Sequence, residues 1–94
     1  MENNSDFAWD PRKEYVNIRK HRINFITAAK AFGDPERKIA IDAKHSEREQ
    51  RFFCGGKVKK RVMTVRFTYR AGKIRIFGAG YWRKGVEYYE EKNR

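Results

Sequence analysis

The hydrophobic and polar positions in the first part of the chain follow a helical pattern. Asp10 and Pro11 form a start signal, because an Asp side chain accepts hydrogen bonds from the free N–H groups of a first turn and Pro at the first helical position loses none. The pattern predicts a helix from here to about His21. We expect the apolar residues 7–9 to form a short edge strand and the polar residues 1–6 to be a frayed tail.

A second apolar stripe follows after a very short connection. Asn24 is a candidate N-cap. Apolar side chains then recur with the spacing i, i+3, i+4 and i+7, at Phe25, Ala28, Ala29 and Phe32. Gly33 is a natural stop, and the Asp34-Pro35 pair prevents the helix from continuing. The two helices are therefore predicted to form a bent pair.

Beyond residue 37 the period changes to the alternation typical of β-strands. Strands are predicted at residues 38–42, 49–54, 60–70 and 73–79. Gly55-Gly56 is expected to end or bulge the second strand, and Ala71-Gly72 to be the tight turn of a hairpin between the last two. We expect a polar loop at residues 43–48 and a short helix, weakened by Gly85, at residues 83–92.

This order of elements predicts an α+β fold in a single domain over residues 1–94. Two N-terminal helices are expected to pack on one face of a mostly antiparallel four-stranded sheet, and a short C-terminal helix follows. In the strongest strand Val65 and Phe67 point one way, toward the helices. Arg66, which lies between two threonines, points to a face that can stay polar.

The formal charge of +11 is concentrated in one block of the chain. Residues 51–86 contain eleven basic and no acidic side chains, whereas residues 1–50 contain ten basic and nine acidic ones. The same block carries aromatic residues, among them Phe67, Tyr81 and Trp82. A basic, aromatic-bearing sheet favours a polyanionic partner, with nucleic acid first and an acidic protein or an anionic membrane second.

Other features of the sequence exclude or disfavour several classes of protein. No run of about 18 apolar residues could span a membrane, and the N-terminus lacks the features of a signal peptide, so we expect a cytoplasmic protein with no membrane partner. Cys54 is the single cysteine, which excludes an intramolecular disulfide. A small residue in a strand is the favoured interpretation of Cys54 over a catalytic thiol.

The residue types permit RNA cleavage without a metal ion and lack the signatures of other hydrolytic chemistry. Metal-assisted nucleases need carboxylates around Mg²⁺, and the basic block has none. His21 and His45 do not share a helix turn that would hold zinc, and Gly55-Gly56 lacks the rest of a phosphate-binding loop. The 2′-OH of RNA can attack its own phosphate if a protein supplies a base, an acid and cations for the phosphate charge.

Several groups remain open for each of these roles. Arginines supply fixed charge in a planar fork, and His21, His45, Glu49, a lysine or a tyrosine could transfer protons. Tyr81 or Trp82 could hold a splayed base by stacking. Each has a structural alternative, because basic residues on a sheet often form a solvated face and a His in a polar loop is exposed by default.

An ordered set of strings in the sequence resembles the BrnT family of toxins. These strings are Phe7-Ala-Trp9-Asp10-Pro11-x-Lys13, Asn17-x-x-Lys20-His21, Phe25-x-x-Ala28, Phe32-x-Asp34-Pro35, Asp42-x-x-His45-Ser46-x-x-Glu49-x-Arg51, Val65-Arg66-Phe67-Thr68-Tyr69-Arg70 and Ile74-Arg75-Ile76. The resemblance covers about residues 7–91. A single string is a weak signal, but their order and spacing together are specific.

The resemblance implies a RelE-like fold and a ribonuclease toxin of a type II toxin–antitoxin pair. Such a toxin halts translation by cutting RNA, including mRNA on the ribosome, without a metal ion or cofactor. The resemblance also implies a BrnA-like antitoxin, which covers the toxin and binds the operon's DNA. The toxin would reach that DNA only through the antitoxin.

The chain departs from the family pattern at two positions. Arg22 stands where the family usually has Gly, so an Arg would be strained if this position needs a positive φ. Gly80 ends a Gly78-Ala79-Gly80 string where many members have Ser-Ala-Arg, so it replaces an arginine. Arg83, in the next turn, is the candidate to replace that cation.

These considerations give two sets of candidate residues. The catalytic candidates are His45, Glu49, Arg51, Arg66, Arg75 and Arg83, with His45 or Glu49 transferring protons and the arginines binding phosphate. The candidates for RNA binding are Lys20, His21, Lys57, Lys59, Lys60, Arg61, Arg70, Trp82 and Lys84. A non-catalytic RNA-binding or ribosome-associated protein would explain the charge equally well, and a toxin that acts only when docked on the ribosome is a third possibility.

Overall fold

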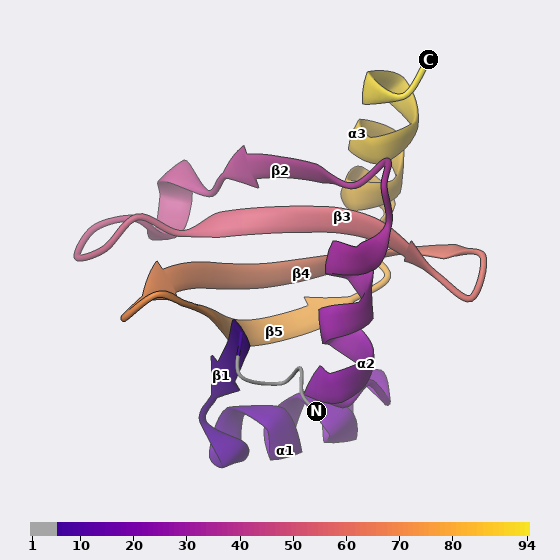
Figure 1. Cartoon of the computed structure of the whole chain (residues 1–94). Helices are drawn as coiled ribbons and strands as arrows, with labels where there is room; N and C mark the ends of the chain where they lie inside the picture. The colour runs from indigo at the N-terminus through magenta and orange to yellow at the C-terminus, as the bar shows by residue number, and fades with distance from the viewer. Residues whose placement is uncertain (1–5) are drawn as a thin grey trace.

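A five-stranded mixed sheet forms the centre of the molecule (Figure 1). The structure, a computed structural model, describes residues 6–94, so the expected frayed tail lies outside the described residues except for Asp6. The strands are β1 (Phe7–Trp9), β2 (Lys38–Ile41), β3 (Phe52–Val58), β4 (Arg61–Arg70) and β5 (Lys73–Gly80). They lie in the order β1-β5-β4-β3-β2, with β1 parallel to β5 and the other neighbouring pairs antiparallel.

The prediction of a four-stranded sheet is wrong, because β1 joins the sheet at its edge. This strand pairs in parallel with Ile74–Ile76 of β5. Phe7 packs edge-on against Phe32, and Trp9 packs edge-on against Phe25. The short apolar segment therefore pairs with the backbone groups at the outer edge of β5. It also brings two large rings against the core.

Three helices complete the fold, and the start signals predicted for the first two are confirmed. The helices are α1 (Pro11–His21), α2 (Phe25–Ala29), which continues as the 3₁₀ turn η2 (Lys30–Gly33), and α3 (Arg83–Lys92). Asp10 accepts a hydrogen bond from the backbone N–H of Arg12, and Asn24 accepts one from that of Thr27. Figure 1 shows α2 crossing in front of the strands and α1 lying beyond β5, at the β1 edge of the sheet.

The helices pack on opposite faces of the sheet. The core under α2 and η2 consists of Ile23, Phe25, Ala28, Ala31, Cys54, Val58, Met63, Val65, Phe67, Ile76 and Ala79. On the other face Gly85 of α3 packs against Thr64, and Tyr89 of α3 packs against Gly55. The predicted division of β4 into an apolar face and a polar face is thus confirmed. The expectation for Cys54 is also confirmed, because it is fully buried and burial raises the pKa of its thiol to about 12.

The second predicted strand starts and ends later than expected. It was expected over residues 49–54, but β3 runs through Gly55-Gly56 to Val58. A Cβ at Gly56 would collide with the backbone carbonyl oxygen of Ala31 in η2. The glycines therefore do not end the strand; the second of them lets η2 approach the sheet closely.

The β3–β4 and β4–β5 hairpins have two-residue turns with left-handed backbone. Lys57 belongs to β3, so the turn between β3 and β4 consists of Lys59 and Lys60, whose φ values are 52° and 72°. Ala71 and Gly72 form the predicted turn between β4 and β5, with φ values of 53° and 76°. Two successive positive φ values match the twist of a hairpin, and they place both lysines of the first turn at the end of the sheet.

Candidate active site

The predicted arginines gather on the sheet face opposite α2. Arg66 and Thr68 are two residues apart on β4, and Thr68 pairs with Arg75 of β5, so alternation places both arginines on the same face. Arg51, just before β3, reaches across the sheet, and its guanidinium lies 4.0 Å from the centre of the Phe77 ring in β5. We call Arg51, Arg66 and Arg75 together the arginine face.

Arg66 has no counterion within residues 6–94. It forms no ion pair with another described residue, and its buried Nε–H has no hydrogen-bond partner there. Its guanidinium lies against the backbone of Gly78, where a Cβ would be only 2.7 Å from Nη2. The charge of Arg66 is therefore available to an anionic ligand.

His45 is oriented by a buried carboxylate. It ends the 3₁₀ turn η3 (Ala43–His45), and its Nδ1 lies 2.9 Å from Oδ2 of Asp42. Asp42 is only 5% exposed, whereas the side chain of His45 is 46% exposed. Because a carboxylate only accepts hydrogen bonds, Nδ1 of a neutral His45 carries the proton and Nε2 keeps a lone pair. The arrangement is that of an oriented general base.

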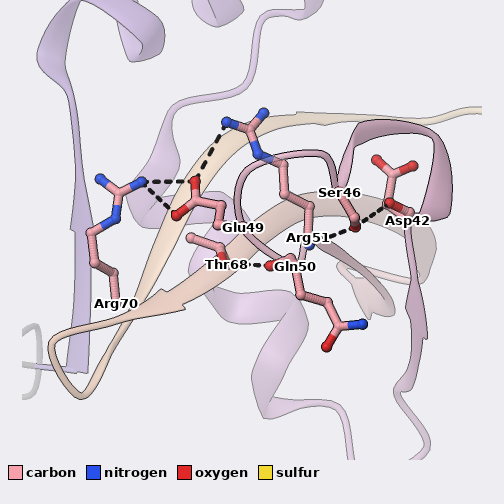
Figure 2. Close-up of polar contacts among 7 residues, drawn as sticks. All are labelled: Asp42, Ser46, Glu49, Gln50, Arg51, Thr68 and Arg70. Carbon is pink, nitrogen blue, oxygen red and sulfur yellow. Dashed lines mark hydrogen bonds and ion pairs between the residues drawn. The ribbon is translucent and has the colours of Figure 1, made fainter.

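Ser46 connects this pair to the start of β3 (Figure 2). Its Oγ donates a hydrogen bond of 2.6 Å to the carbonyl oxygen of Asp42 and accepts one of 2.9 Å from the backbone N–H of Arg51. The backbone N–H of Asp42 also donates to the carbonyl oxygen of Arg51 at 2.7 Å. One short segment therefore positions both His45 and a cation of the arginine face.

Glu49 forms ion pairs with two arginines. Figure 2 shows its carboxylate between them, accepting from Nη2 of Arg70 at 2.9 and 2.8 Å and from Nη2 of Arg51 at 3.5 Å. The hydrogen bond from Arg70, assisted by the positive charges of both arginines, holds the pKa of Glu49 below its ordinary value. A carboxylate with a lowered pKa is a weaker base, and this one acts as the counterion that aligns Arg51.

Two pockets divide the predicted site residues into two groups. A pocket of about 380 Å³ is lined by Lys44, His45, Glu47, Arg48, Glu49 and Arg51. A larger pocket of about 650 Å³ beside α3 has Arg66, Trp82 and Lys84 in its lining. The two groups meet at β5, because Arg51 contacts Phe77 and Arg66 contacts the next residue, Gly78.

The predicted RNA-binding residues lie at several places around these pockets. Trp82 is fixed in position, because its indole lies against Gly80 and its ring centre is 5.3 Å from that of His21. The guanidinium of Arg61 lies 3.7 Å from the centre of the Tyr81 ring. Lys20, Lys57, Lys59, Lys60 and Lys84 are exposed and form no ion pair within the described residues, and the same is true of the catalytic candidate Arg83. Of this set, Arg70 alone is held by an acidic residue, Glu49.

Both departures from the family pattern have a structural counterpart. Arg22 caps α1 with φ 59° and ψ 32°, so the chain places an Arg in the left-handed conformation that favours glycine. At Gly80 a Cβ would lie 2.7–2.8 Å from three carbon atoms of the Trp82 indole. In this chain the ring of Trp82 therefore occupies the space that a side chain at position 80 would need.

Sequence reasoning missed Asp42 as the partner of His45, and it also missed two walls of the larger pocket, Phe53 and Tyr88. The spacing of Asp42 and His45, three residues apart in a polar loop, is a signal that could have revealed the pair. The sequence offers no such signal for Phe53 and Tyr88, because they come from a strand and a helix 35 residues apart.

Comparison with known families agrees with the resemblance seen in the sequence. Within residues 6–94 no group of three His, Cys, Asp or Glu side chains could hold a metal ion, and no helix in that range is long and apolar enough to cross a membrane. No curated protein matches the chain. A family model described as the ribonuclease toxin, BrnT, of type II toxin–antitoxin systems matches residues 9–85. Because this match covers most of the chain, the protein belongs to the BrnT family of ribonuclease toxins of type II toxin–antitoxin systems.

Proposed function

We propose that this toxin is an endoribonuclease that cuts RNA without a metal ion and thereby inhibits translation. The observation that carries the proposal is the arginine face, where Arg66 has no counterion within the described residues and Arg51 is tied to the oriented Asp42–His45 pair. Fixed cations beside an oriented base are the two parts that transesterification of RNA requires.

In this mechanism His45 is the proton-transfer group and Glu49 is not. Nε2 of His45 takes the proton of a 2′-OH, and the resulting alkoxide attacks the adjacent phosphorus. Asp42 keeps the ring oriented and stabilises the imidazolium that forms. The bond to the 5′-oxygen breaks as a water molecule gives that oxygen a proton, His45 returns its proton to the resulting hydroxide, and the products are a 2′,3′-cyclic phosphate and a 5′-hydroxyl end.

The arginines stabilise the charge that develops on the phosphate. Arg66 and Arg75 bind its non-bridging oxygens, and Arg51, which lines one pocket with His45 and contacts Phe77 next to Gly78, supplies a further cation. We assign the third phosphate contact to Arg83, an exposed residue in the first turn of α3, in place of the arginine absent at Gly80.

The remaining basic residues guide the RNA to this site. Lys59 and Lys60 at the hairpin turn attract the backbone from a distance, as do Lys20, Lys57, Arg61 and Lys84. We further propose a BrnA-like antitoxin as the partner that covers this surface. The antitoxin would also be the route by which the toxin associates with the operon's DNA in the cytoplasm.

Cleavage of a defined RNA by the purified protein in EDTA tests the proposal. The wild type should cut the RNA and leave 2′,3′-cyclic phosphate ends, and it should stop protein synthesis in a cell-free system. Arg66→Ala should abolish cleavage, whereas Arg12→Ala, at an arginine whose side chain is 92% exposed on α1, should leave it intact. RNA binding with a steep salt dependence but no cleavage, on free RNA or on ribosomes, would instead support a non-catalytic RNA-binding protein.

A further inference from the structure

The larger pocket has the walls of a site for a flat ring. Phe53 from β3, Trp82 just before α3 and Tyr88 from α3 all line it. Its volume of about 650 Å³ is typical of ligand-binding clefts. One wall is already fixed in the protein alone, because the indole of Trp82 is held between Gly80 and His21. The pocket is therefore a pre-formed aromatic cleft.

The polar groups of the pocket indicate what the ring must carry. The charged residues that line it are Lys38, Arg66 and Lys84, all of them cationic. The guanidinium of Arg66 forms no ion pair with another described residue, so its charge is free to meet a ligand in the pocket. A ligand that satisfies these groups has a carbonyl oxygen on an aromatic ring and an anionic group beside it.

We propose that this pocket binds one unpaired nucleobase of the RNA, with a base carbonyl oxygen accepting a hydrogen bond from the guanidinium of Arg66. The base stacks between the aromatic walls, and the neighbouring phosphate faces Lys84. Guanine, uracil and cytosine carry a carbonyl group and adenine carries none, so the pocket discriminates against adenine. The inference rests on the proposed function, because it makes the pocket the element that selects where the RNA is cut.

An apolar side chain of a partner protein fits the same cleft less well. Such a side chain would fill the space between Phe53 and Tyr88, but it would leave the guanidinium of Arg66 without an acceptor. It would also leave Lys38 and Lys84 without an anion. The nucleobase satisfies both requirements, and competition by the antitoxin is an outcome that the test distinguishes.

Nucleotide binding by ¹⁵N-labelled full-length protein tests the pocket without any need for catalysis. Guanosine and uridine 5′-monophosphates should shift the indole N–H signal of Trp82 and leave that of Trp9 in place. Adenosine 5′-monophosphate should bind roughly tenfold more weakly. Tyr88→Ala should weaken binding of the first two by roughly tenfold or more, whereas Tyr15→Ala, at a tyrosine 60% exposed on α1, should not.

Cleavage of a randomised RNA then separates this inference from the proposed function. The wild type should cut beside one preferred base, Tyr88→Ala should cut with little preference, and His45→Ala should bind nucleotides without cutting. If Tyr88→Ala fails to fold, Lys84→Gln tests the pocket instead. Lys84 is exposed, so its replacement cannot disturb the core, and it should weaken nucleotide binding. Cleavage without any nucleotide effect on Trp82 overturns the pocket alone, and nucleotide binding without cleavage overturns the proposed function alone. Tyr88→Ala binding nucleotides normally but losing the antitoxin would assign the pocket to the antitoxin instead.

Discussion

At the scale of single residues, the site divides two acidic side chains between two tasks. Asp42 is buried and faces Nδ1 of His45, so it orients the group proposed to transfer protons. Glu49 is held by Arg70 and Arg51, which lower its pKa and engage its oxygens. The difference follows from the partners, since one carboxylate meets an imidazole and the other meets guanidinium groups.

This division predicts opposite outcomes for His45 and Glu49. Glu49→Gln removes a negative charge that aligns Arg51, and we expect cleavage to fall by less than about tenfold. His45→Ala removes the base, and we expect a loss of about 10²-fold or more. Single-turnover cleavage of a short RNA measures both. A Glu49→Gln variant as inactive as His45→Ala would make Glu49 the proton-transfer group and remove the role given to His45.

Gly78 and Gly80 have a different structural role from a glycine in a turn. Neither residue is needed for a positive φ, because the left-handed glycine in the described chain is Gly72. Their missing side chains instead make room for the guanidinium of Arg66 and the indole of Trp82. In the sequence, Gly78-Ala79-Gly80 looks like a string that has lost an arginine. In the structure its two glycines are the surface on which the side chains of Arg66 and Trp82 lie.

Gly80→Arg, which restores the residue of many relatives, should consequently disturb the site. Its Cβ would come within 2.7 Å of the Trp82 indole, so the ring must leave His21. We expect the free energy of unfolding to fall by about 1–3 kcal/mol and the fluorescence of Trp82 to change. Denaturant unfolding measures the first effect. Gly33→Ala is the control, because a Cβ there meets no atom within 4 Å; equal stability of the Gly80 variant and the wild type would contradict the packing seen here.

The sequence predicts which residues form the site better than it predicts which residues they contact. The alternation in β4 placed Arg66 on the polar face, because strand periodicity is a local property. The capture of Glu49 by Arg70 could not be predicted, since it depends on the register of a strand 21 residues further along the chain. The same holds for the ring of Trp82 over Gly80, which depends on how the chain turns after β5.

At the scale of elements, one carboxylate fastens α3 to the rest of the fold. Oδ2 of Asp34 accepts a 2.6 Å hydrogen bond from the hydroxyl of Tyr89 and one of 2.7 Å from the backbone N–H of Lys57. Burial alone would raise the pKa of Asp34, but these bonds and one from the backbone N–H of Glu36 outweigh it and lower the pKa. Because α3 forms one side of the larger pocket, this contact also supports the site.

Alkaline pH should break the hydrogen bond between Tyr89 and Asp34 over a defined pH range. Burial and the hydrogen bond to Asp34 raise the pKa of Tyr89 from 10.0 to about 12. Its contribution is therefore complete below pH 10, where the tyrosine is neutral in both states, and it is lost as pH rises toward 12, because the unfolded state gives up its proton first. Unfolding followed by circular dichroism should show a fall in the free energy of unfolding over this range.

Two conservative variants isolate this titration from that of the lysines. In Tyr89→Phe the free energy of unfolding should be about 1.5–3 kcal/mol lower at neutral pH, and the difference from the wild type should shrink above pH 10. Tyr88→Phe, at the neighbouring and 38% exposed tyrosine, should follow the wild type throughout. A constant difference between Tyr89→Phe and the wild type from pH 8 to 12 would show that the tyrosine does not titrate as stated.

The elements that local signals define were predictable, and those that distant contacts define were not. The caps at Asp10 and Asn24 and the turn at Ala71-Gly72 act within a few residues of themselves, and all three are confirmed. The place of β1 in the sheet depends on parallel pairing with β5, more than 60 residues later in the chain. The path of β3 through Gly56 depends on the carbonyl group of Ala31, which no local pattern contains.

At the scale of the whole molecule, the basic block of the sequence becomes one side of the fold. Residues 51–86 form β3, β4, β5 and the start of α3, and they include every arginine of the arginine face. Two acidic side chains that contact this block, Glu49 and Asp34, are already occupied by internal partners. The positive field of this region is therefore largely uncompensated, which favours fast and salt-sensitive binding of a polyanion.

The salt dependence of RNA binding should report how much of this charge meets phosphate. Each phosphate contact to a single strand contributes about 0.7 to the slope of log K against log salt concentration. Replacing Lys57, Lys59 and Lys60 by Gln should lower the magnitude of that slope by about 2 if all three meet phosphate. Replacing Arg12, Arg19 and Lys92, which are exposed on α1 and α3, removes the same charge and should change the slope much less. Fluorescence anisotropy of a labelled RNA, with the His45→Ala background to prevent cleavage, measures both slopes. Equal reductions in the two triple variants would mean that only the net charge of the toxin matters and that the turn between β3 and β4 does not contact the RNA.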